Sequence, residues 1–341
     1  MFARFTIKKG DINLTHYWRK RYVLVKRYNQ VKILTILPEF IPAESVKEMV
    51  KQVLPEMVIV NSIDFEKNDA EVLVATTFTK LDRHELSKFP NLKYIQIAST
   101  GYDNVDTQYI KEKGITLCNI PVANRQSVSE HVIAFMLAFL KDIIFLNDEL
   151  KERKNWPMLT GSRDLEGKTV GIVGMGAIGK EIAKRLLPFG VSLVYYDVKR
   201  LPEEEEERLG LTFLEFEDLL NSSDIVTVHV PLNEKTRSMF NSSAFSKMKD
   251  GAIFINTARG EVVDEKALIE AIKGKGIKAG IDVYQKEPPD FSSELFKLDN
   301  VIFSPHIAGV TIESQQRFLM ETISNVMRYV QGIDPLYKVV F

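Results

Sequence analysis

Three reactive side chains near the C-terminal end of the chain each follow an apolar, β-branched run. Arg259, Glu287 and His306 come after three successive runs of this kind. Such runs are typical of buried strands, and ligands of open parallel sheets bind outside the carboxyl ends of the strands. Arginine binds anions, and histidine moves protons near neutral pH. Each residue alone would more often be a surface or packing residue, but the three together indicate a catalytic site.

A glycine-rich loop predicts that a dinucleotide binds to the same part of the chain. The pattern Gly-x-Gly-x-x-Gly covers residues 174–179, with an apolar strand pattern before it and a helical pattern after it, over Lys180–Leu187. Gly174 permits the tight turn, Gly176 lets the backbone approach the pyrophosphate, and Gly179 allows close packing of helix on strand. The pyrophosphate would then bind at the positive N-terminus of the helix.

Asp197 ends the next apolar run, Leu193–Tyr196, and is placed to choose between the two nicotinamide cofactors. Its carboxylate would accept hydrogen bonds from the adenosine ribose and repel the 2′-phosphate of NADP. Lys199 and Arg200 follow closely and could partly accommodate that phosphate. The cofactor predicted from these residues is therefore NAD(H), with the strictness of the preference left open.

Short strand patterns alternate with amphipathic stretches from Val31 onward, as in parallel sheets whose strands are joined by helices. In the first half, strands are predicted at Val31–Leu37, Met57–Val60, Val72–Ala75, Tyr94–Ile97 and Thr116–Asn119. In the second half they are predicted at Val170–Val173, Leu193–Tyr196, Ile225–Val230, Ile253–Ile255, Ala279–Ile281 and Val301–Phe303. This pattern predicts an α/β fold of two doubly wound parallel-sheet units, of which the glycine loop opens the second. A final amphipathic helix is expected over Thr311–Val330.

Between the two units, a capping-box pattern from Ser127 to Glu130 predicts the start of a long helix. This helix is apolar on nearly all sides from Val132 to Leu146. An all-round apolar helix must be buried against something. We expect a domain interface or a dimer partner to cover it.

Composition argues against nucleic-acid and membrane partners. The 341 residues have a formal net charge of −1, which gives no overall attraction to nucleic acid or to anionic membranes. The longest apolar run, Val132–Leu140, is too short to cross a bilayer. The single cysteine, Cys118, lies in an apolar run and is expected to be buried in a protein of the reducing cytoplasm. Residues 1–30 are basic and are expected to be an N-terminal extension before the first core strand.

Taken together, the motifs resemble those of the D-isomer-specific 2-hydroxyacid dehydrogenases, from Val31 to the C-terminus. The matching motifs are Ser99–Asp106, Ser127–His131, the glycine loop, His229–Leu232, Ile255–Gly260, Gly280–Pro288 and Ser304–Gly309. The resemblance implies a flavodoxin-like substrate domain over residues 31–128, completed by residues 308–341, and a Rossmann NAD-binding domain over residues 129–307. It also implies a homodimer formed through the NAD-binding domain, with catalysis in the cleft between the two domains.

The resemblance assigns the catalytic arginine, acid and histidine to Arg259, Glu287 and His306. NADH would supply a hydride to C2 of a 2-oxo acid, and His306 would supply the proton. Glu287 would favour the imidazolium form and fix the orientation of the ring. Arg259 would hold the substrate carboxylate in a two-point contact and polarise the carbonyl. The backbone amides of Thr100 and Gly101 would bind the other side of the carboxylate.

The resemblance also assigns the residues around the cofactor. Asp282 corresponds to the residue that contacts the nicotinamide carboxamide. The rest of the predicted cofactor site consists of Gly174, Gly176, Ala177, Ile178, Gly179, Asp197, Val230, Pro231, Thr236, Thr257 and Ala258. His229 is expected near the cofactor, and His131 is expected to pack or cap at the start of the long helix. No metal ion is expected.

The expected substrate is a small 2-hydroxy or 2-oxo acid such as glyoxylate, hydroxypyruvate or pyruvate. D-3-phosphoglycerate dehydrogenase without a regulatory domain is the main alternative. Those enzymes commonly have an arginine after the third strand, in an Arg-Ser-x-Thr pattern that faces the substrate phosphate. Thr76 stands at that position here, and Lys80 would give a less directional contact. Phosphite dehydrogenase and NAD-sensing corepressors of the C-terminal-binding-protein type share the Arg–Glu–His set and are further alternatives.

Overall fold

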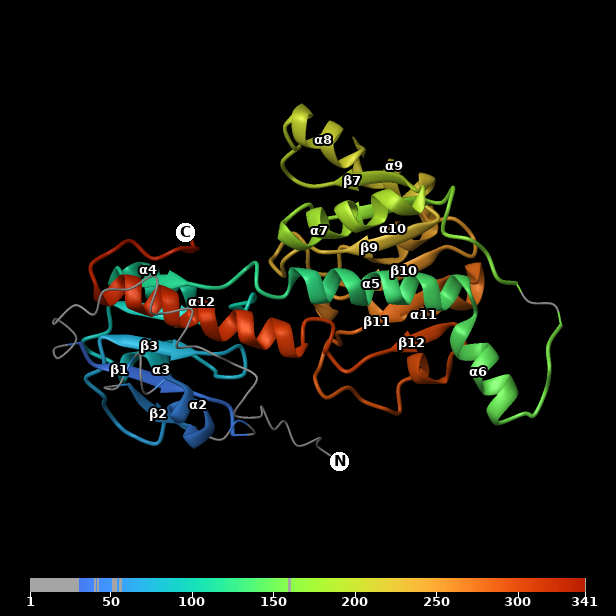
Figure 1. Cartoon of the computed structure of the whole chain (residues 1–341). Helices are drawn as coiled ribbons and strands as arrows, with labels where there is room; N and C mark the ends of the chain where they lie inside the picture. Colours follow the sequence, from blue (N-terminus) through green and yellow to red (C-terminus); the bar gives the residue numbers. More distant parts are fainter. Residues whose placement is uncertain are drawn as a thin grey trace. The chain divides into compact units, whose positions relative to one another are not determined.

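The computed structural model describes residues 31–39, 41, 43–50, 54, 57–158 and 161–340 (Figure 1). The chain forms two compact units. Unit 1 comprises the residues up to Ala123 together with Gln315–Phe341, and unit 2 comprises Asn124–Ser314. The expected N-terminal extension, residues 1–30, lies outside the described residues.

Unit 1 is built on a five-stranded parallel sheet in the order β2-β1-β3-β4-β5. This is the flavodoxin-like doubly wound order, so the predicted fold is confirmed. The strands are β1 (Ile33–Ile36), β2 (Val58–Val60), β3 (Val72–Ala75), β4 (Tyr94–Ile97) and β5 (Thr116–Cys118). The helices are α2 (Ala43–Val50), α3 (Arg83–Ser87), α4 (Thr107–Lys113) and α12 (Ile312–Val330).

Alternate residues of the unit 1 strands enter two separate apolar cores. Leu34 and Leu73 belong to one core, whereas Ile33 and Val72 belong to the other. Successive side chains of a strand point to opposite faces of the sheet, and here helices cover both faces. The strands therefore read as unbroken apolar runs rather than as alternating ones, which is why their positions could be predicted.

A buried amide pair fastens the C-terminal part of the chain to this sheet. Asn325 of α12 donates to Gln96 Oε1 at 2.9 Å, and its own Oδ1 accepts the N–H of Leu336 at 2.8 Å. Gln96 and Asn325 are both almost fully buried, so each bond satisfies a polar group that water cannot reach. The C-terminal helix is therefore an integral part of unit 1.

Unit 2 contains a seven-stranded parallel sheet in the order β12-β11-β10-β9-β6-β7-β8. The order reverses between β6 and β9, as in Rossmann folds, and such switch points are where these sheets bind ligands. The strands are β6 (Thr169–Val173), β7 (Ser192–Tyr196), β8 (Leu211–Phe213), β9 (Ile225–Val228), β10 (Ile253–Asn256), β11 (Lys278–Ile281) and β12 (Val301–Phe303). Of these, only the edge strand β8 was not predicted.

Helices cover both faces of this sheet (Figure 1). They are α5 (Arg125–Leu140), α7 (Ala177–Leu186), α8 (Glu203–Leu209), α9 (Phe216–Ser222), α10 (Ser242–Lys247) and α11 (Glu265–Lys275), with α6 (Ile143–Lys151) following α5. Short 3₁₀ helices lie at Leu187–Phe189, Gly260–Val262 and Glu294–Lys297. No helix in the described part of the chain is long and apolar enough to cross a membrane.

The long helix predicted between the units is in fact two helices. α5 ends at Leu140, and Asp142, with a left-handed φ of 51°, separates it from α6. α5 packs against α7 and β10 inside unit 2. Its own unit therefore buries one side of α5, including Val132, Phe135 and Met136, whereas Ile133 and Leu137 are only half-buried, so a dimer partner on this helix stays a prediction.

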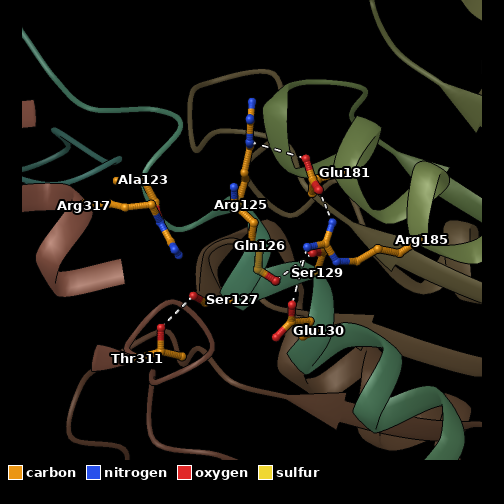
Figure 2. Close-up of polar contacts among 10 residues, drawn as sticks. All are labelled: Ala123, Arg125, Gln126, Ser127, Ser129, Glu130, Glu181, Arg185, Thr311 and Arg317. Atoms are coloured by element: carbon orange, nitrogen blue, oxygen red, sulfur yellow. Dashed lines mark hydrogen bonds and ion pairs between the residues drawn. The ribbon is translucent and has the colours of Figure 1, made fainter. Parts of the chain in front are cut away.

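The expected capping box at the start of this helix is also wrong. α5 begins at Arg125, before the predicted cap, and Ser127 Oγ lies 2.9 Å from Thr311 Oγ1 instead (Figure 2). Ser129 donates to the carbonyl of Gln126 at 2.7 Å. The whole helix thus belongs to unit 2, and the units divide at residues 123/124 and 314/315 rather than at the predicted 128/129 and 307/308.

Candidate active site

His306 and Glu287 form a hydrogen-bonded pair beyond the ends of the neighbouring strands β12 and β11. His306 Nδ1 lies 2.7 Å from Glu287 Oε2, and Glu287 Oε1 accepts the N–H of Tyr284 at 3.1 Å. Burial opposes ionisation of Glu287, but the hydrogen bonds from His306 and Tyr284 and the nearby positive charges outweigh it and lower the pKa of this carboxyl. A carboxylate at Nδ1 leaves Nε2 as the ring nitrogen that can exchange a proton with a substrate.

The loop that carries His306 is fastened to Asp282, a carboxylate that is 1% exposed and directly follows β11. Asp282 Oδ1 accepts the N–H of Ile307 at 2.9 Å, and Oδ2 accepts the N–H of Ala308 at 3.0 Å. The backbone oxygen of Asp282 accepts the N–H of His306 at 2.7 Å. His306 has a left-handed φ of 54°, which residues with a β-carbon rarely adopt. Asp282 therefore sets the direction in which His306 leaves the sheet.

Arg259 follows β10, the strand next to β11. Asn256 holds this loop by donating to the carbonyl of Arg259 at 2.9 Å. At Gly260 a β-carbon would lie 2.0 Å from the carbonyl carbon of Tyr284, so a larger residue would push the loop away. The charge of Arg259 is one of the groups that lower the pKa of Glu287. The structure thus brings the three predicted catalytic side chains to one edge of the unit 2 sheet.

The glycine loop between β6 and α7 fits a dinucleotide. Gly174 has a φ of 100°, and a β-carbon there would lie 2.6 Å from the carbonyl oxygen of His229. A β-carbon at Gly179 would lie 2.3 Å from the carbonyl oxygen of Gly174, whereas one at Gly176 would meet nothing within 4 Å. The space over Gly176 is therefore open, and within the described residues no side chain caps the first amides of α7. Such amides, which include those of Ala177 and Ile178, bind phosphate groups.

Asp197 lies beside this loop, where a cofactor ribose would be expected. Its Oδ2 accepts the N–H of Met175 at 2.7 Å, and its Oδ1 accepts the N–H of Lys199 at 3.2 Å. Arg200, which could have met a 2′-phosphate, is instead held by Glu206 through bonds of 2.9 and 2.8 Å. Glu206 is 6% exposed, and its hydrogen bonds with Arg200 and Tyr195 lower its pKa to about 2. This arrangement favours NAD over NADP.

Two buried polar atoms at the carboxyl edge of the sheet, Thr257 Oγ1 and His229 Nδ1, have no hydrogen-bond partner among the described residues. Buried polar groups without a partner are rare and need an explanation, such as a ligand that completes them. Burial also lowers the pKa of His229 to about 3, so its ring is neutral. Thr236 has a different task, because its hydroxyl donates to the carbonyl of Pro231 at 2.6 Å and shapes the turn after β9.

The remaining predicted residues divide between the units. Val230 and Ala258 lie in the loops after β9 and β10 of unit 2. Thr100 and Gly101 follow β4 of unit 1, where Asn119 donates to the carbonyl of Thr100 at 2.6 Å. In the part of the chain that the structure describes, no group of three or more His, Cys, Asp or Glu side chains could hold a metal ion.

Sequence reasoning missed three supporting residues. Asn256 shapes the Arg259 loop, and Ser304 and His131 bond to each other behind His306 at 2.9 Å. His131 was expected to pack or cap at the helix start. Its ring does pack edge-on against Phe135, and its Nε2 also reaches the His306 loop from α5. Asn256 is the last residue of β10 and Ser304 is the first residue after β12, and this position at the carboxyl end of a strand was the signal that could have identified them.

The comparisons with known proteins agree with this geometry. The family model described as D-isomer specific 2-hydroxyacid dehydrogenase, NAD binding domain, matches residues 133–308. The chain belongs to this family. It is 40% identical to a hydroxypyruvate reductase of Thermotoga maritima over 76% of this chain and 85% of that protein. It is also 40% identical to a D-3-phosphoglycerate dehydrogenase of Archaeoglobus fulgidus, over 77% of this chain but 50% of that protein.

Solved structures show the same fold. The D-lactate dehydrogenase of Aquifex aeolicus, crystallised with NAD and lactic acid, is 32% identical and matches with a TM-score of 0.79 over 88% of this chain and 96% of that one. This D-2-hydroxyacid dehydrogenase is an NAD-dependent oxidoreductase that acts on CH–OH donors. When bound, NAD(H) accepts or supplies the hydride, and the residues of the chain must do the rest.

Proposed function

We propose that this dehydrogenase acts on a small, unphosphorylated 2-hydroxy or 2-oxo acid such as glyoxylate, hydroxypyruvate or pyruvate. The loop that follows β3 is the observation that carries the proposal. Thr76 stands where a phosphate-binding arginine would be needed, and Lys80 is paired with Asp82 at 2.7 Å. A paired, exposed lysine offers a phosphate no directed two-point contact. The similarity to a hydroxypyruvate reductase over most of both chains supports the same substrate class.

Each catalytic side chain has a task in this reaction. His306, oriented through Nδ1 by Glu287, gives the proton to the alkoxide oxygen during reduction and takes it back during oxidation. Arg259 binds the substrate carboxylate and polarises the 2-oxo group. Thr100 and Gly101, in unit 1, supply backbone amides to the same carboxylate. In this arrangement unit 2 binds NAD(H) and unit 1 contributes to the substrate site.

A substrate panel with a designed variant tests the proposal. We expect kcat/KM with NADH to be higher for glyoxylate, hydroxypyruvate or pyruvate than for phosphohydroxypyruvate. Thr76→Arg should raise kcat/KM for phosphohydroxypyruvate by about 10- to 100-fold, the value of one charge-assisted contact. Thr76→Gln, which adds length without charge, is the matched control. A wild-type preference for the phosphorylated acid would show that the enzyme is a phosphoglycerate dehydrogenase instead.

A homodimer formed through unit 2 is the second part of the proposal. The exposed apolar side chains of α6 and of the segment after it support this part of the proposal. Ile143, Phe145 and Leu150 are each at least half exposed, and Trp156 and Met158 are 75% and 81% exposed. Large apolar side chains that are exposed close together in a soluble protein are typical of protein interfaces. We infer that a second copy of the chain covers these side chains.

A further inference from the structure

A line of hydrogen bonds runs from α5 to the loop that carries His306. His131 Nε2 lies 2.9 Å from Ser304 Oγ, and Ser304 Oγ lies 2.5 Å from Asp282 Oδ1. Asp282 in turn accepts the backbone amides of Ile307 and Ala308, the two residues after His306. The reaction proposed above uses neither His131 nor Ser304. Their line of hydrogen bonds nevertheless ends at Asp282, whose carboxylate shapes the His306 loop.

The donors and acceptors of this line can be assigned from its chemistry. A carboxylate only accepts hydrogen bonds, so the single hydroxyl proton of Ser304 points to Asp282. Ser304 Oγ can then only accept from His131, whose Nε2 must carry a proton. Burial lowers the pKa of His131, although the charge of Asp282 partly opposes this. His131 is therefore the neutral Nε2–H tautomer, and its ring is also fixed edge-on against Phe135, 4.7 Å away.

Asp282 can bind the two amides of the loop only while its carboxylate keeps its orientation, and that orientation depends on the other hydrogen bonds that it accepts. A carboxylate offers about four lone-pair positions. Three are filled, by the hydroxyl of Ser304 and by the amides of Ile307 and Ala308. Ser304 opens the same loop and is the only side-chain donor among these three partners, so the bond that it receives from His131 of α5 sets how its hydroxyl, and with it the carboxylate, is turned. The left-handed backbone of His306, with a φ of 54°, depends on these bonds because that conformation is unfavourable without support.

We propose that His131 and Ser304 are positioning residues for His306, acting through Asp282. The inference rests on the proposed role of His306 as acid–base, but it concerns different residues. Without the His131–Ser304 bond, the carboxylate of Asp282 turns away from the two amides. The His306 loop then relaxes towards ordinary backbone angles, and the ring leaves the place where Nε2 meets the substrate oxygen.

Paired substitutions in the full-length enzyme separate positioning from packing. Ser304→Ala removes the bridging hydroxyl and Ser304→Thr keeps it. His131→Phe removes the Nε2–H donor, whereas His131→Gln keeps a donor at a similar distance. We expect Ser304→Ala and His131→Phe to lower kcat by about 10- to 100-fold, the range for a bond to a charged group. The dissociation constant of NADH, from fluorescence titration, should rise by less than kcat falls, because Asp282 is expected to make only one of the several contacts that hold the cofactor.

Three further readouts belong to the same experiment. Ser304→Thr and His131→Gln should recover most of kcat, and the Ser304→Ala/His131→Phe double variant should be no slower than the slower single variant. The kinetic isotope effect on kcat with 4-deuterated NADH should rise in the slow variants, because chemistry becomes rate-limiting. Ser223→Ala is the matched control, since it removes another buried serine hydroxyl of unit 2, which donates to the carbonyl of Leu219 at 2.6 Å.

The outcomes distinguish this inference from the proposed function. Full activity in His306→Gln would overturn the acid–base role itself. An inactive His306→Gln together with wild-type kcat in Ser304→Ala and His131→Phe would overturn only the positioning role. Equal losses in His131→Gln and His131→Phe, accompanied by equal falls in Tm, would show that the ring serves packing alone and would also overturn it.

Discussion

At the scale of single residues, Arg259 should be irreplaceable by lysine. Arg259→Lys keeps the positive charge but loses the planar fork that can contact a carboxylate and a carbonyl together. We expect KM for the 2-oxo acid to rise by about 10- to 100-fold, with a fall in kcat as well. Steady-state kinetics with saturating NADH measure both values. Normal kinetics in the lysine variant would mean that another group binds the substrate carboxylate.

The bond between Glu206 and Arg200 predicts a second residue-scale effect, on cofactor choice. Glu206→Gln removes the charge that holds Arg200 through two bonds, and the freed guanidinium can meet a 2′-phosphate. We expect kcat/KM for NADPH relative to NADH to rise about tenfold, and NADPH to bind more tightly in titrations without substrate. Glu205→Gln is the control, because Glu205 is the neighbouring acid of α8 and pairs with Lys180, so its loss leaves the Glu206–Arg200 pair in place. An unchanged cofactor ratio in Glu206→Gln would contradict the prediction.

The same carboxyl should give stability a defined pH dependence. The pKa of Glu206 is lowered from 4.5 to about 2 in the folded chain, by its hydrogen bonds with Arg200 and then with Tyr195. A group whose pKa is lowered by folding stabilises the fold above its unfolded pKa, and this stabilisation disappears as the pH falls through the folded value. The Tm difference between wild type and Glu206→Gln should therefore be constant above about pH 5 and shrink from there towards pH 2. Differential scanning fluorimetry across this range measures it, and a difference that grows on acidification would contradict the assignment.

At the scale of elements, two glycines of the loop between β6 and α7 are expected to differ in what they support: Gly179 the fold, and Gly176 cofactor binding. Gly179→Ala would place a methyl group 2.3 Å from the carbonyl oxygen of Gly174, so we expect a clear loss of Tm. Gly176→Ala meets no protein atom within 4 Å and should leave Tm unchanged. Its methyl group would however occupy the space that the pyrophosphate needs, so NADH binding should weaken strongly. Calorimetric titration beside thermal melts decides this, and wild-type affinity in Gly176→Ala would mean that the dinucleotide lies elsewhere.

Most strands could be predicted because both faces of each sheet are covered. A strand with two buried faces reads as an apolar run, as in Val72–Ala75, and the residue after such a run lies at the ligand edge. This is why Arg259, Glu287 and His306 could be found. The strand β8 (Leu211–Phe213) was missed because it reads Leu-Thr-Phe, with Thr212 exposed, and so lacks the unbroken apolar run of the equally short edge strands β2 and β12.

Features that depend on contacts between distant segments could not be predicted. The serines at the start of α5 match a capping box locally, but Ser127 instead forms a hydrogen bond with Thr311. This partner is far away in the sequence, so no local pattern could predict it. The same is true of His131 and Ser304, which meet only when α5 packs beside the loop after β12. Sequence patterns therefore identified the residues that we propose to contact the substrate, whereas the residues that we propose to position them could be found only in the structure.

At the scale of the whole molecule, the chain passes from one unit to the other twice. In each unit, a hydrogen bond joins the two segments that lead to these crossings. In unit 2, Ser127 Oγ lies 2.9 Å from Thr311 Oγ1, and in unit 1, Arg317 donates to the carbonyl of Ala123 at 2.6 Å (Figure 2). The two crossings are thus joined on both sides of the division at 123/124 and 314/315.

Cys118 is fully buried, as expected, and its burial raises the pKa of the thiol to about 11. A cytoplasmic location, which agrees with this unreactive thiol, stays a prediction.

The assembly of two chains is the last prediction. α6 carries exposed apolar side chains that a partner would bury, because Phe145 is 52% and Ile144 47% exposed. We expect the enzyme to sediment as a dimer at micromolar concentration, and Ile144→Lys/Phe145→Glu to sediment as a monomer because buried charges would be unpaired at the interface. Val58→Glu places the same charge on an exposed apolar position of unit 1, where Val58 is 57% exposed, and should remain dimeric. A wild-type protein that sediments as a monomer would remove the dimer and leave the exposed face of α6 to another partner.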